Sequence, residues 1–168
     1  MASEFALENG VVLRRARRAD LLDLLRLVRA YYRFDHIDFD AASVAAGLRT
    51  LLKNADVGQA WLMERGHRPL GYVVCTFGFD LEFGGRQATI TDLYLHPHFR
   101  GRGLGRATLG LLERELRKAG VRALELQVTQ GNRKVLGFYK RLGFETHARI
   151  PLSKRIFGDV KTLKRSKG

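Results

Sequence analysis

The chain of 168 residues has the usual length of one domain, and its 45% apolar residues are enough to build a hydrophobic core. It contains no run of 18 apolar residues, and its first thirty residues carry Arg14, Arg15, Arg17 and Arg18 in place of an apolar signal segment, which argues against a membrane-spanning or secreted protein. The one cysteine, Cys75, lies in an apolar run and has no internal disulfide partner, so we expect a buried thiol in a cytoplasmic protein.

The net charge of +13 is concentrated in one part of the chain. Residues 1–96 hold 12 Lys and Arg against 12 Asp and Glu, whereas residues 97–168 hold 18 against 5. We therefore expect an anionic partner for the second segment. Nucleic acid, a membrane surface and a phosphorylated cofactor all fit, and charge alone does not choose among them.

We expect one domain over residues 10–160, a flexible tail over residues 1–9, which lack periodicity, and a basic tail over residues 161–168. Apolar spacing and turn residues predict, in chain order, a strand at 11–13, a helix from 20, a helix at 41–53, strands at 60–64, 70–79 and 87–95, a helix at 104–119, a strand at 123–128, a helix at 133–142 and a strand at 144–150. Local hairpins followed by a β-α-β crossover indicate an α/β fold with a mixed sheet and helices on it.

The predicted strand at 87–95 has a regular alternation. Ala88, Ile90, Asp92 and Tyr94 alternate with Thr89, Thr91, Leu93 and Leu95, which is typical of a central strand.

A glycine-rich loop separates this strand from the most amphipathic helix. It comprises Arg100, Gly101, Arg102, Gly103, Leu104, Gly105 and Arg106. Glycine lets the backbone approach a ligand, the free N–H groups of a helix start point at it, and guanidinium groups suit phosphate, so a pyrophosphate is the expected occupant. The alternative is that the glycines only shape a turn with solvated arginines around it.

Two familiar phosphate motifs do not match this loop. The dinucleotide fingerprint needs a third glycine where Arg106 stands, and the ATP-binding loop needs a Gly-Lys-Ser/Thr sequence that is absent.

The sequence resembles the GNAT superfamily of acetyl-coenzyme A dependent N-acetyltransferases. The matching features are the segment 92–97, the loop at 100–105, Asn132 with Tyr139 seven positions later, and Gly143-Phe144. The resemblance covers residues 10–150 and departs at Val135, where the family usually has a small residue. It implies a GNAT-like, largely antiparallel sheet with flanking helices and a splayed strand pair that admits coenzyme A. Residues 79–95 and the acidic segment near 35 are most similar to small-amine acetyltransferases of the spermidine/spermine type.

The resemblance also implies a cosubstrate site for acetyl-CoA. The residues that it assigns are Leu93, Tyr94, Leu95, the whole loop from Arg100 to Arg106, Asn132 and Tyr139. Among them, the Leu93 N–H would face the thioester oxygen as an oxyanion donor. Asn132 would hold the pantetheine arm, and a helix N-cap is its equally weighted alternative.

Acid and base candidates follow from the same resemblance. Tyr139 matches the position at which many members of the family place the general acid. The chemistry is suitable, because a phenol with a pKa near ~10 can give a proton to a thiolate whose conjugate acid has a pKa near ~8.5. Its alternative is a core position in an apolar helix stripe. An alkylamine with a pKa near ~10.4 needs a base, for which Asp92 is the first candidate and Glu82 and Asp80 follow. For Glu82, the alternative is a solvated residue at the sheet edge.

The segment between the first two helices carries three carboxylates and two phenylalanines. The resemblance implies that the first two helices flank the acceptor cleft, so the predicted acceptor-binding residues are Phe34, Asp35 and Asp38, together with Asp80, and they suit a cationic, partly apolar amine. The alternative is a plain loop in which Asp40 or Ser43 caps the second helix. His96 and His98 flank a proline without nearby cysteines, so we expect no metal.

The leading hypothesis is an N-acetyltransferase that acts on a small amine, with a protein lysine or N-terminus as the next acceptor. A basic nucleic-acid or ribosome-associated binding protein is the alternative of a different class, and it lacks an aromatic-basic strand motif or a helix-turn-helix. A coenzyme A binder without turnover is a third alternative. The family likeness favours a homodimer, and no membrane partner is expected.

Overall fold

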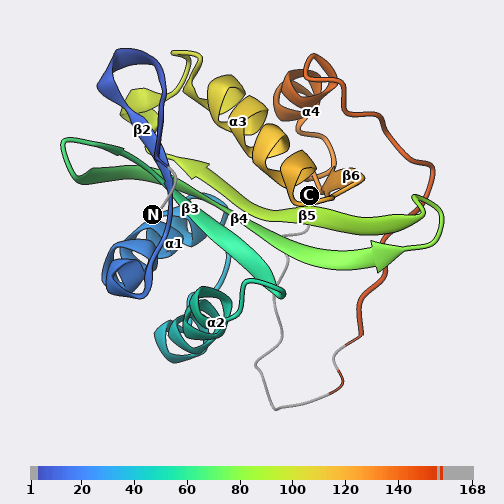
Figure 1. The fold of residues 1–168 in the computed structure, drawn as a ribbon, viewed down its shortest axis with the longest axis horizontal. Coiled ribbons are helices and arrows are strands. Elements are labelled where there is room, and N and C mark those ends of the chain that lie inside the picture. Colours follow the sequence, from blue (N-terminus) through green and yellow to red (C-terminus); the bar gives the residue numbers. More distant parts are fainter. Residues whose placement is uncertain (1–3, 155, 157–168) are drawn as a thin grey trace.

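The computed structural model describes residues 4–154 and 156. Six strands of the described chain form one sheet in the order β1-β2-β3-β4-β5-β6, and four α-helices accompany it (Figure 1). The strands are β1 (Glu4–Ala6), β2 (Val12–Arg15), β3 (Gly58–Arg65), β4 (Arg68–Asp80), β5 (Gly85–Leu95) and β6 (Ala123–Leu126). The helices are α1 (Leu21–Phe34), α2 (Ala41–Lys53), α3 (Leu104–Lys118) and α4 (Arg133–Lys140).

Every neighbouring pair of strands is antiparallel except β5 and β6, which run parallel because α3 connects them as a crossover helix. The predicted α/β class with a mixed, largely antiparallel sheet is therefore confirmed. Among the described residues, no helix is long and apolar enough to cross a membrane.

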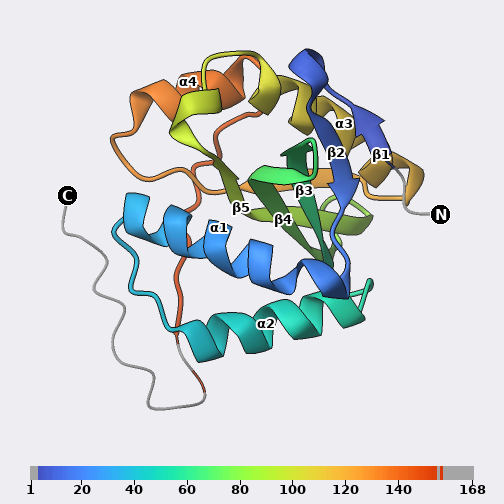
Figure 2. The same cartoon turned by 90° about the vertical axis from the view of Figure 1, so that its left-hand side faces the viewer.

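The sheet lies between two helix layers, with α1 and α2 on one face and α3 and α4 on the other (Figure 2). Leu24, Leu62 and Tyr72 are fully buried in the core on the α1 and α2 side. Leu13, Cys75 and Leu112 are fully buried in the core on the α3 side, so the predicted burial of the thiol is confirmed. Burial raises the pKa of Cys75 to about 11, which keeps it a thiol at neutral pH.

Local sequence signals predict where α2 begins and ends. Asp40 accepts a hydrogen bond from the Ser43 N–H at 2.7 Å and caps the helix, which confirms the capping alternative for this position. The observed bounds of α2 equal the predicted ones.

Two predictions at the ends of the chain are wrong. Glu4–Ala6, which we placed in a tail outside the domain, form β1, because Phe5 packs on the core and the strand pairs with β2. Residues 144–150 contain no strand in the structure. Most of their side chains are exposed, so pairing with β6 would bury little apolar surface. Residues 161–168, the predicted basic tail, lie outside the described residues.

A β-bulge interrupts the regular alternation of β5. Val74 pairs with Asp92 and Cys75 pairs with Ile90, so Thr91 is an extra residue on β5. Ala88 and Ile90 therefore belong to the core under α3, whereas Tyr94 belongs to the core under α1. The bulge therefore breaks the alternation, since one extra residue exchanges the faces of everything that follows.

Candidate active site

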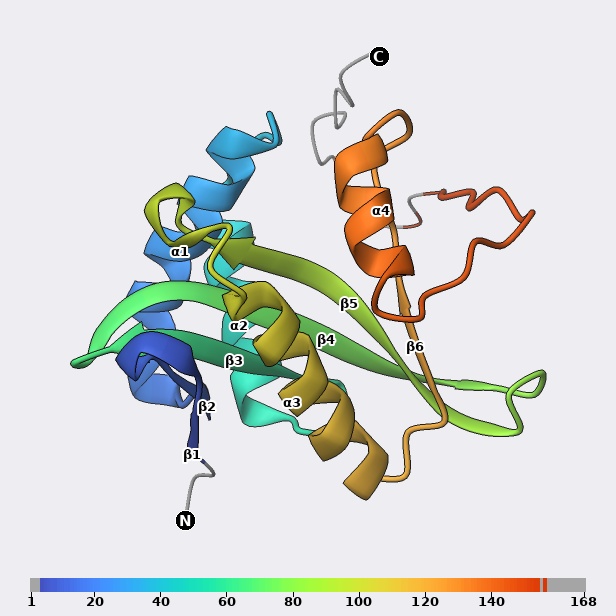
Figure 3. The same ribbon diagram turned by 90° about the horizontal axis from the view of Figure 1, so that it is seen from above.

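The two parallel strands separate where the bulge occurs. Pairing between β5 and β6 runs from Gln87↔Ala123 to Ile90↔Leu126 and then stops, while β5 continues to Leu95 (Figure 3). On its other side β5 stays paired with β4 as far as Leu95. The splayed strand pair expected from the resemblance is thus present after Ile90.

The pairing of β5 with β4 determines which backbone groups of β5 face the edge that β6 has left. The His96 N–H donates to the Leu70 carbonyl at 2.9 Å, so His96 and, by alternation, Tyr94 and Asp92 direct their N–H and C=O groups at β4. Leu93 and Leu95 direct theirs at the edge that β6 has left. The sheet therefore offers main-chain donors and acceptors to an extended ligand on this edge.

The glycine-rich loop has the conformation that its glycines permit. Gly101 has φ 74° and Gly103 has φ 79°, both in the left-handed region, and α3 begins directly after Gly103. The interpretation that glycines shape this turn is confirmed. Among the residues that the structure describes, no side chain caps α3, so the N–H groups of its first turn are available to an anion.

The three loop arginines differ in what they contact. Arg100 is turned toward α1, where its Nε donates to the Leu95 carbonyl at 2.8 Å and its guanidinium lies 4.3 Å from the Phe34 ring centre. Arg102 lies 6.0 Å from the Phe99 ring centre, and Arg106 is exposed in the first turn of α3. Arg106 and Arg102 are the ones that stand free to meet phosphate.

Asp92 is half-buried just after the bulge, with both carboxylate oxygens hydrogen-bonded. The Tyr72 hydroxyl donates to Oδ1 at 3.3 Å, and the Thr91 hydroxyl donates to Oδ2 at 3.0 Å. Burial raises the pKa of Asp92, and the two hydrogen bonds oppose that rise. A carboxylate with a raised pKa is a stronger base than a solvated one, which suits proton removal from an amine.

Three elements converge around Asp92. Burial raises the pKa of Tyr31 on α1, and the nearby charges of Asp35 and Asp92 and the Tyr139 phenol raise it further. Asp92 from β5 and Tyr139 from α4 therefore lie within electrostatic reach of one hydroxyl, although they start from opposite faces of the sheet.

Aromatic rings surround this point. The Tyr31 ring centre lies 5.8 Å from that of Tyr32 and 6.1 Å from that of Tyr94, and the Tyr72 and Tyr94 ring centres are 6.4 Å apart. Such ring faces attract cations, and Asp92 adds a negative charge beside them.

Tyr139 is half-buried on α4, with its ring 5.2 Å from Phe138 and 5.4 Å from Phe144 between ring centres. Burial raises the pKa of Tyr139, so the phenol keeps its proton at neutral and mildly alkaline pH. Tyr139 therefore packs in an apolar stripe of α4, and its hydroxyl is protonated, as the hydroxyl of a general acid must be. Asn132 accepts from the Val135 N–H at 3.1 Å and caps α4, which confirms its N-cap alternative.

The remaining predicted residues are placed less favourably. Phe34, Asp35 and Asp38 are exposed on the segment between α1 and α2, at the end of α1 that also carries Tyr31. Asp80 and Glu82 lie at the far tip of the β4–β5 hairpin, six or more residues from the Asp92 pairing position, which is about 20 Å along a strand.

Contacts at the hairpin tip explain these two acids. Asp80 accepts from the Glu82 N–H at 2.7 Å, and Arg149 pairs with the exposed Glu82 carboxylate at 2.8 Å. The structure therefore does not bring either acid together with Asp92, and for Glu82 the edge alternative describes its position.

A groove of about 1000 Å³ lies beside β6, between α3, α4 and the segment 142–151. Tyr139 lines it, as does Glu82 at the hairpin tip, whereas Asp92 is not among its lining residues. The groove gives the acid candidate access from outside the sheet.

Sequence reasoning missed three residues of the site. Tyr31 and Tyr72 were visible only as members of apolar patterns, and Thr91 looked like an ordinary alternating strand residue. The adjacent tyrosines at the end of α1, close to the acidic segment, were the one local signal. The rest depends on pairing between β4 and β5.

His96 and His98 stack with ring centres 5.2 Å apart. Within the described chain, no group of three or more His, Cys, Asp or Glu side chains could hold a metal ion. That the protein needs no metal stays a prediction.

Comparisons with known proteins agree with this geometry. The Acetyltransferase (GNAT) family matches residues 21–144. An uncharacterized N-acetyltransferase of Methanocaldococcus jannaschii is 33% identical over 135 residues, which make up 79% of this chain and 60% of that protein. The chain therefore spans about 60% of the length of this curated relative.

Solved structures extend the likeness to nearly the whole fold. An integron cassette protein from the mobile metagenome of Cole Harbour Salt Marsh is 31% identical, with a TM-score of 0.77 over 87% of this chain and 91% of that chain. A protein of Clostridium acetobutylicum, described as a predicted acetyltransferase with acetyl-CoA, shares the fold with a TM-score of 0.72 at 20% identity, over 85% of this chain and 96% of that one. With its splayed strands, its glycine loop at the start of α3 and a family match over most of its length, this chain belongs to the GNAT family of acetyltransferases.

Proposed function

We propose that this protein transfers the acetyl group of acetyl-CoA to a primary amine by direct attack, with Asp92 as general base and Tyr139 as general acid. The observation that carries this proposal is the separation of β5 from β6 after Ile90, which leaves one backbone edge of β5 unpaired with β6 next to the half-buried Asp92 on the same strand. Family membership supports the reaction class.

The described residues fit acetyl-CoA. The first-turn N–H groups of α3, with Arg102 and Arg106, supply donors and positive charge for a pyrophosphate. The Leu93 N–H and C=O and the Leu95 N–H face the edge that β6 has left and suit the amide groups of a pantetheine arm, whereas the Leu95 carbonyl accepts from Arg100. When bound, acetyl-CoA supplies an acetyl thioester as the acyl donor.

Proton movement then follows from the chain's own groups. The amine nitrogen forms a bond to the acetyl carbon, and the Leu93 N–H stabilises the negative charge on the carbonyl oxygen. Asp92 accepts the proton that the amine loses. As the carbon–sulfur bond breaks, Tyr139 gives a proton to the departing thiolate, so the products are an N-acetylated amine and free CoA thiol.

The acceptor that suits the site best is a small cationic amine. Tyr31 and Tyr32 offer ring faces, and Asp92 and Asp35 offer negative charge, on the side of the sheet that α1 covers. A lysine side chain or a protein N-terminus is the next acceptor class, since both present the same amine.

The family likeness also leads us to propose a homodimer, and exposed apolar side chains support it. Phe79 and Leu81 at the hairpin tip are 72% and 88% exposed, and Ile150 beside them on the Arg149 segment is 82% exposed. Light scattering would give the mass. The cytoplasmic location stays a prediction.

The test is thiol release from acetyl-CoA against polyamines, amino acids, aminoglycosides and lysine peptides. We expect amine-dependent turnover that falls about 10- to 100-fold in Tyr139→Phe, because the thiolate then leaves without an acid. Tyr32→Phe, which keeps the ring and lies outside the proton path, is the matched control. A melting temperature that acetyl-CoA does not raise would exclude the cosubstrate, and binding without turnover on any amine would exclude the reaction.

A further inference from the structure

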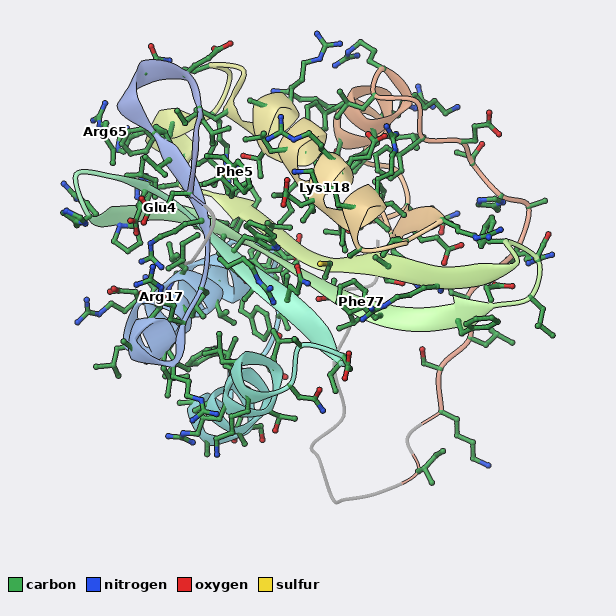
Figure 4. The ribbon with its side chains drawn as sticks, viewed as in Figure 1. Glu4, Phe5, Arg17, Arg65, Phe77 and Lys118 are labelled. Carbon is green, nitrogen blue, oxygen red and sulfur yellow. The ribbon has the colours of Figure 1, made fainter. Side chains whose placement is uncertain are left out.

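An N-terminal segment outside the family match contacts the start of α3. Residues 4–10 comprise β1 and a short 3-10 helix (Glu8–Gly10), and they precede the matched residues 21–144. The Phe5 ring lies 6.2 Å from that of Trp61, and the Arg114 guanidinium of α3 lies 5.4 Å from its centre. Figure 4 shows Phe5 between the N-terminal strands and α3. The segment is therefore fixed against the domain, beside the glycine loop (Figures 1 and 3).

Glu8 comes from this segment and adjoins Gly103. A methyl group placed on Gly103 would lie 3.1 Å from Glu8 Oε2, so the carboxylate is within about 5 Å of the Gly103 Cα. Gly103 is the residue before the first turn of α3, where the partial positive charge of the helix is greatest. Glu8 is exposed, so its side chain is free to move in solvent.

This acid contrasts with its surroundings. The glycine-rich loop carries three arginines. Among the described residues, no side chain caps the N–H groups in the first turn of α3. In the protein without a ligand, the partial positive charge at the start of α3 attracts a carboxylate at that position. It repels the pyrophosphate that would bind there, because both carry negative charge a few ångströms apart.

We propose that Glu8 is an affinity-determining residue of the cosubstrate site, whose carboxylate competes with the pyrophosphate of acetyl-CoA for the start of α3. The inference rests on the proposed function, since it takes acetyl-CoA as the ligand of the loop. Binding of acetyl-CoA requires the carboxylate to turn away, and the loss of that contact together with the remaining repulsion weakens binding.

The experiment measures CoA and inorganic pyrophosphate binding by calorimetry to the wild type, Glu8→Gln and Glu4→Gln. Glu4 is an exposed acid four residues earlier on the same segment, so its variant has the same net charge without a change at the loop. We expect Glu8→Gln to bind CoA about three- to tenfold more tightly at low salt, and this ratio to fall toward one at about 0.5 M salt. Pyrophosphate should show the same order of variants.

The outcomes separate the two claims. Wild-type protein that binds no CoA would contradict the proposed function. Wild-type binding with equal gains in both variants would show a general charge effect and overturn the role of Glu8. Weaker binding by Glu8→Gln, or a ratio that salt does not change, would also overturn it, because the carboxylate would then support the loop instead of competing at it.

Discussion

The two halves of β5 have the same alternating sequence and different surroundings. From Gln87 to Ile90 the strand is paired on both sides, and its side chains Ala88 and Ile90 fill the core under α3. From Thr91 to Leu95 it is paired on one side, and its side chains include Asp92 and Tyr94 on the α1 face.

The difference between the halves separates stability from chemistry. A strand held on both sides buries its backbone groups in the ladder and contributes core packing. Beyond the bulge, the same strand keeps one ladder for rigidity and leaves the other edge for a ligand. With one inserted residue, β5 therefore continues as a strand, but its second part leaves an edge for a ligand where its first part is held on both sides.

The largest expected effect of a change in the second half is on rate. Asp92→Asn removes the base while keeping the shape, so kcat/KM with an amine should fall about 10²- to 10³-fold near neutral pH. The deficit should narrow as pH rises, because the amine then loses its own proton. An unchanged rate, or a deficit independent of pH, would exclude Asp92 as the base.

The same variant should not lose stability. Burial raises the pKa of Asp92 in the folded protein, so the folded state binds more protons than the unfolded state and the wild type loses stability as pH rises through that pKa. Asp92→Asn has no such loss, and urea unfolding at pH 7 should show it to be at least as stable as the wild type.

A truncation in the first half should give the opposite result. Ile90 is 6% exposed in the core under α3, so Ile90→Ala should lower the free energy of unfolding by about 2–4 kcal/mol. Its kcat/KM should stay within about twofold at a temperature where the variant is folded. A rate loss as large as that of Asp92→Asn would remove the distinction between the halves.

A smaller change tests how the hydrogen bonds to Asp92 affect its pKa. Tyr72→Phe removes the donor to Asp92 Oδ1, and this hydrogen bond lowers the pKa of Asp92, so the pKa should rise. The acidic limb of the kcat/KM profile should move to higher pH, with little change on the alkaline side. Thr91→Val removes the other donor and should move the limb in the same direction; a shift toward lower pH in either variant would contradict this geometry.

The parts of the fold that sequence predicts well depend on neighbours along the chain. The bounds of α2 follow from Asp40 as a cap, and the hairpin between β3 and β4 follows from the turn at Gly66. The glycine loop and Asn132 with Tyr139 are also local patterns, which is why the cosubstrate side could be proposed from the resemblance.

The rest depends on contacts between distant residues. Thr91 is recognisable as a bulge only against β4, because the sequence of β5 by itself keeps its alternation. Glu8 reaches Gly103 across 95 positions, and no local pattern of residues 1–9 predicts it. Residues 144–150 alternate as a strand would, yet a strand also needs a partner edge and apolar surface to bury.

Amide hydrogen exchange at Leu93 and Tyr94, without and with CoA, tests most directly whether the open edge of β5 binds the cosubstrate. We expect the Leu93 amide, which faces the open edge, to exchange much faster than the Tyr94 amide, which faces β4, and we expect CoA to slow Leu93 strongly while Tyr94 changes little. Equal protection of both amides in the free protein, or a Leu93 rate that saturating CoA does not change, would contradict it.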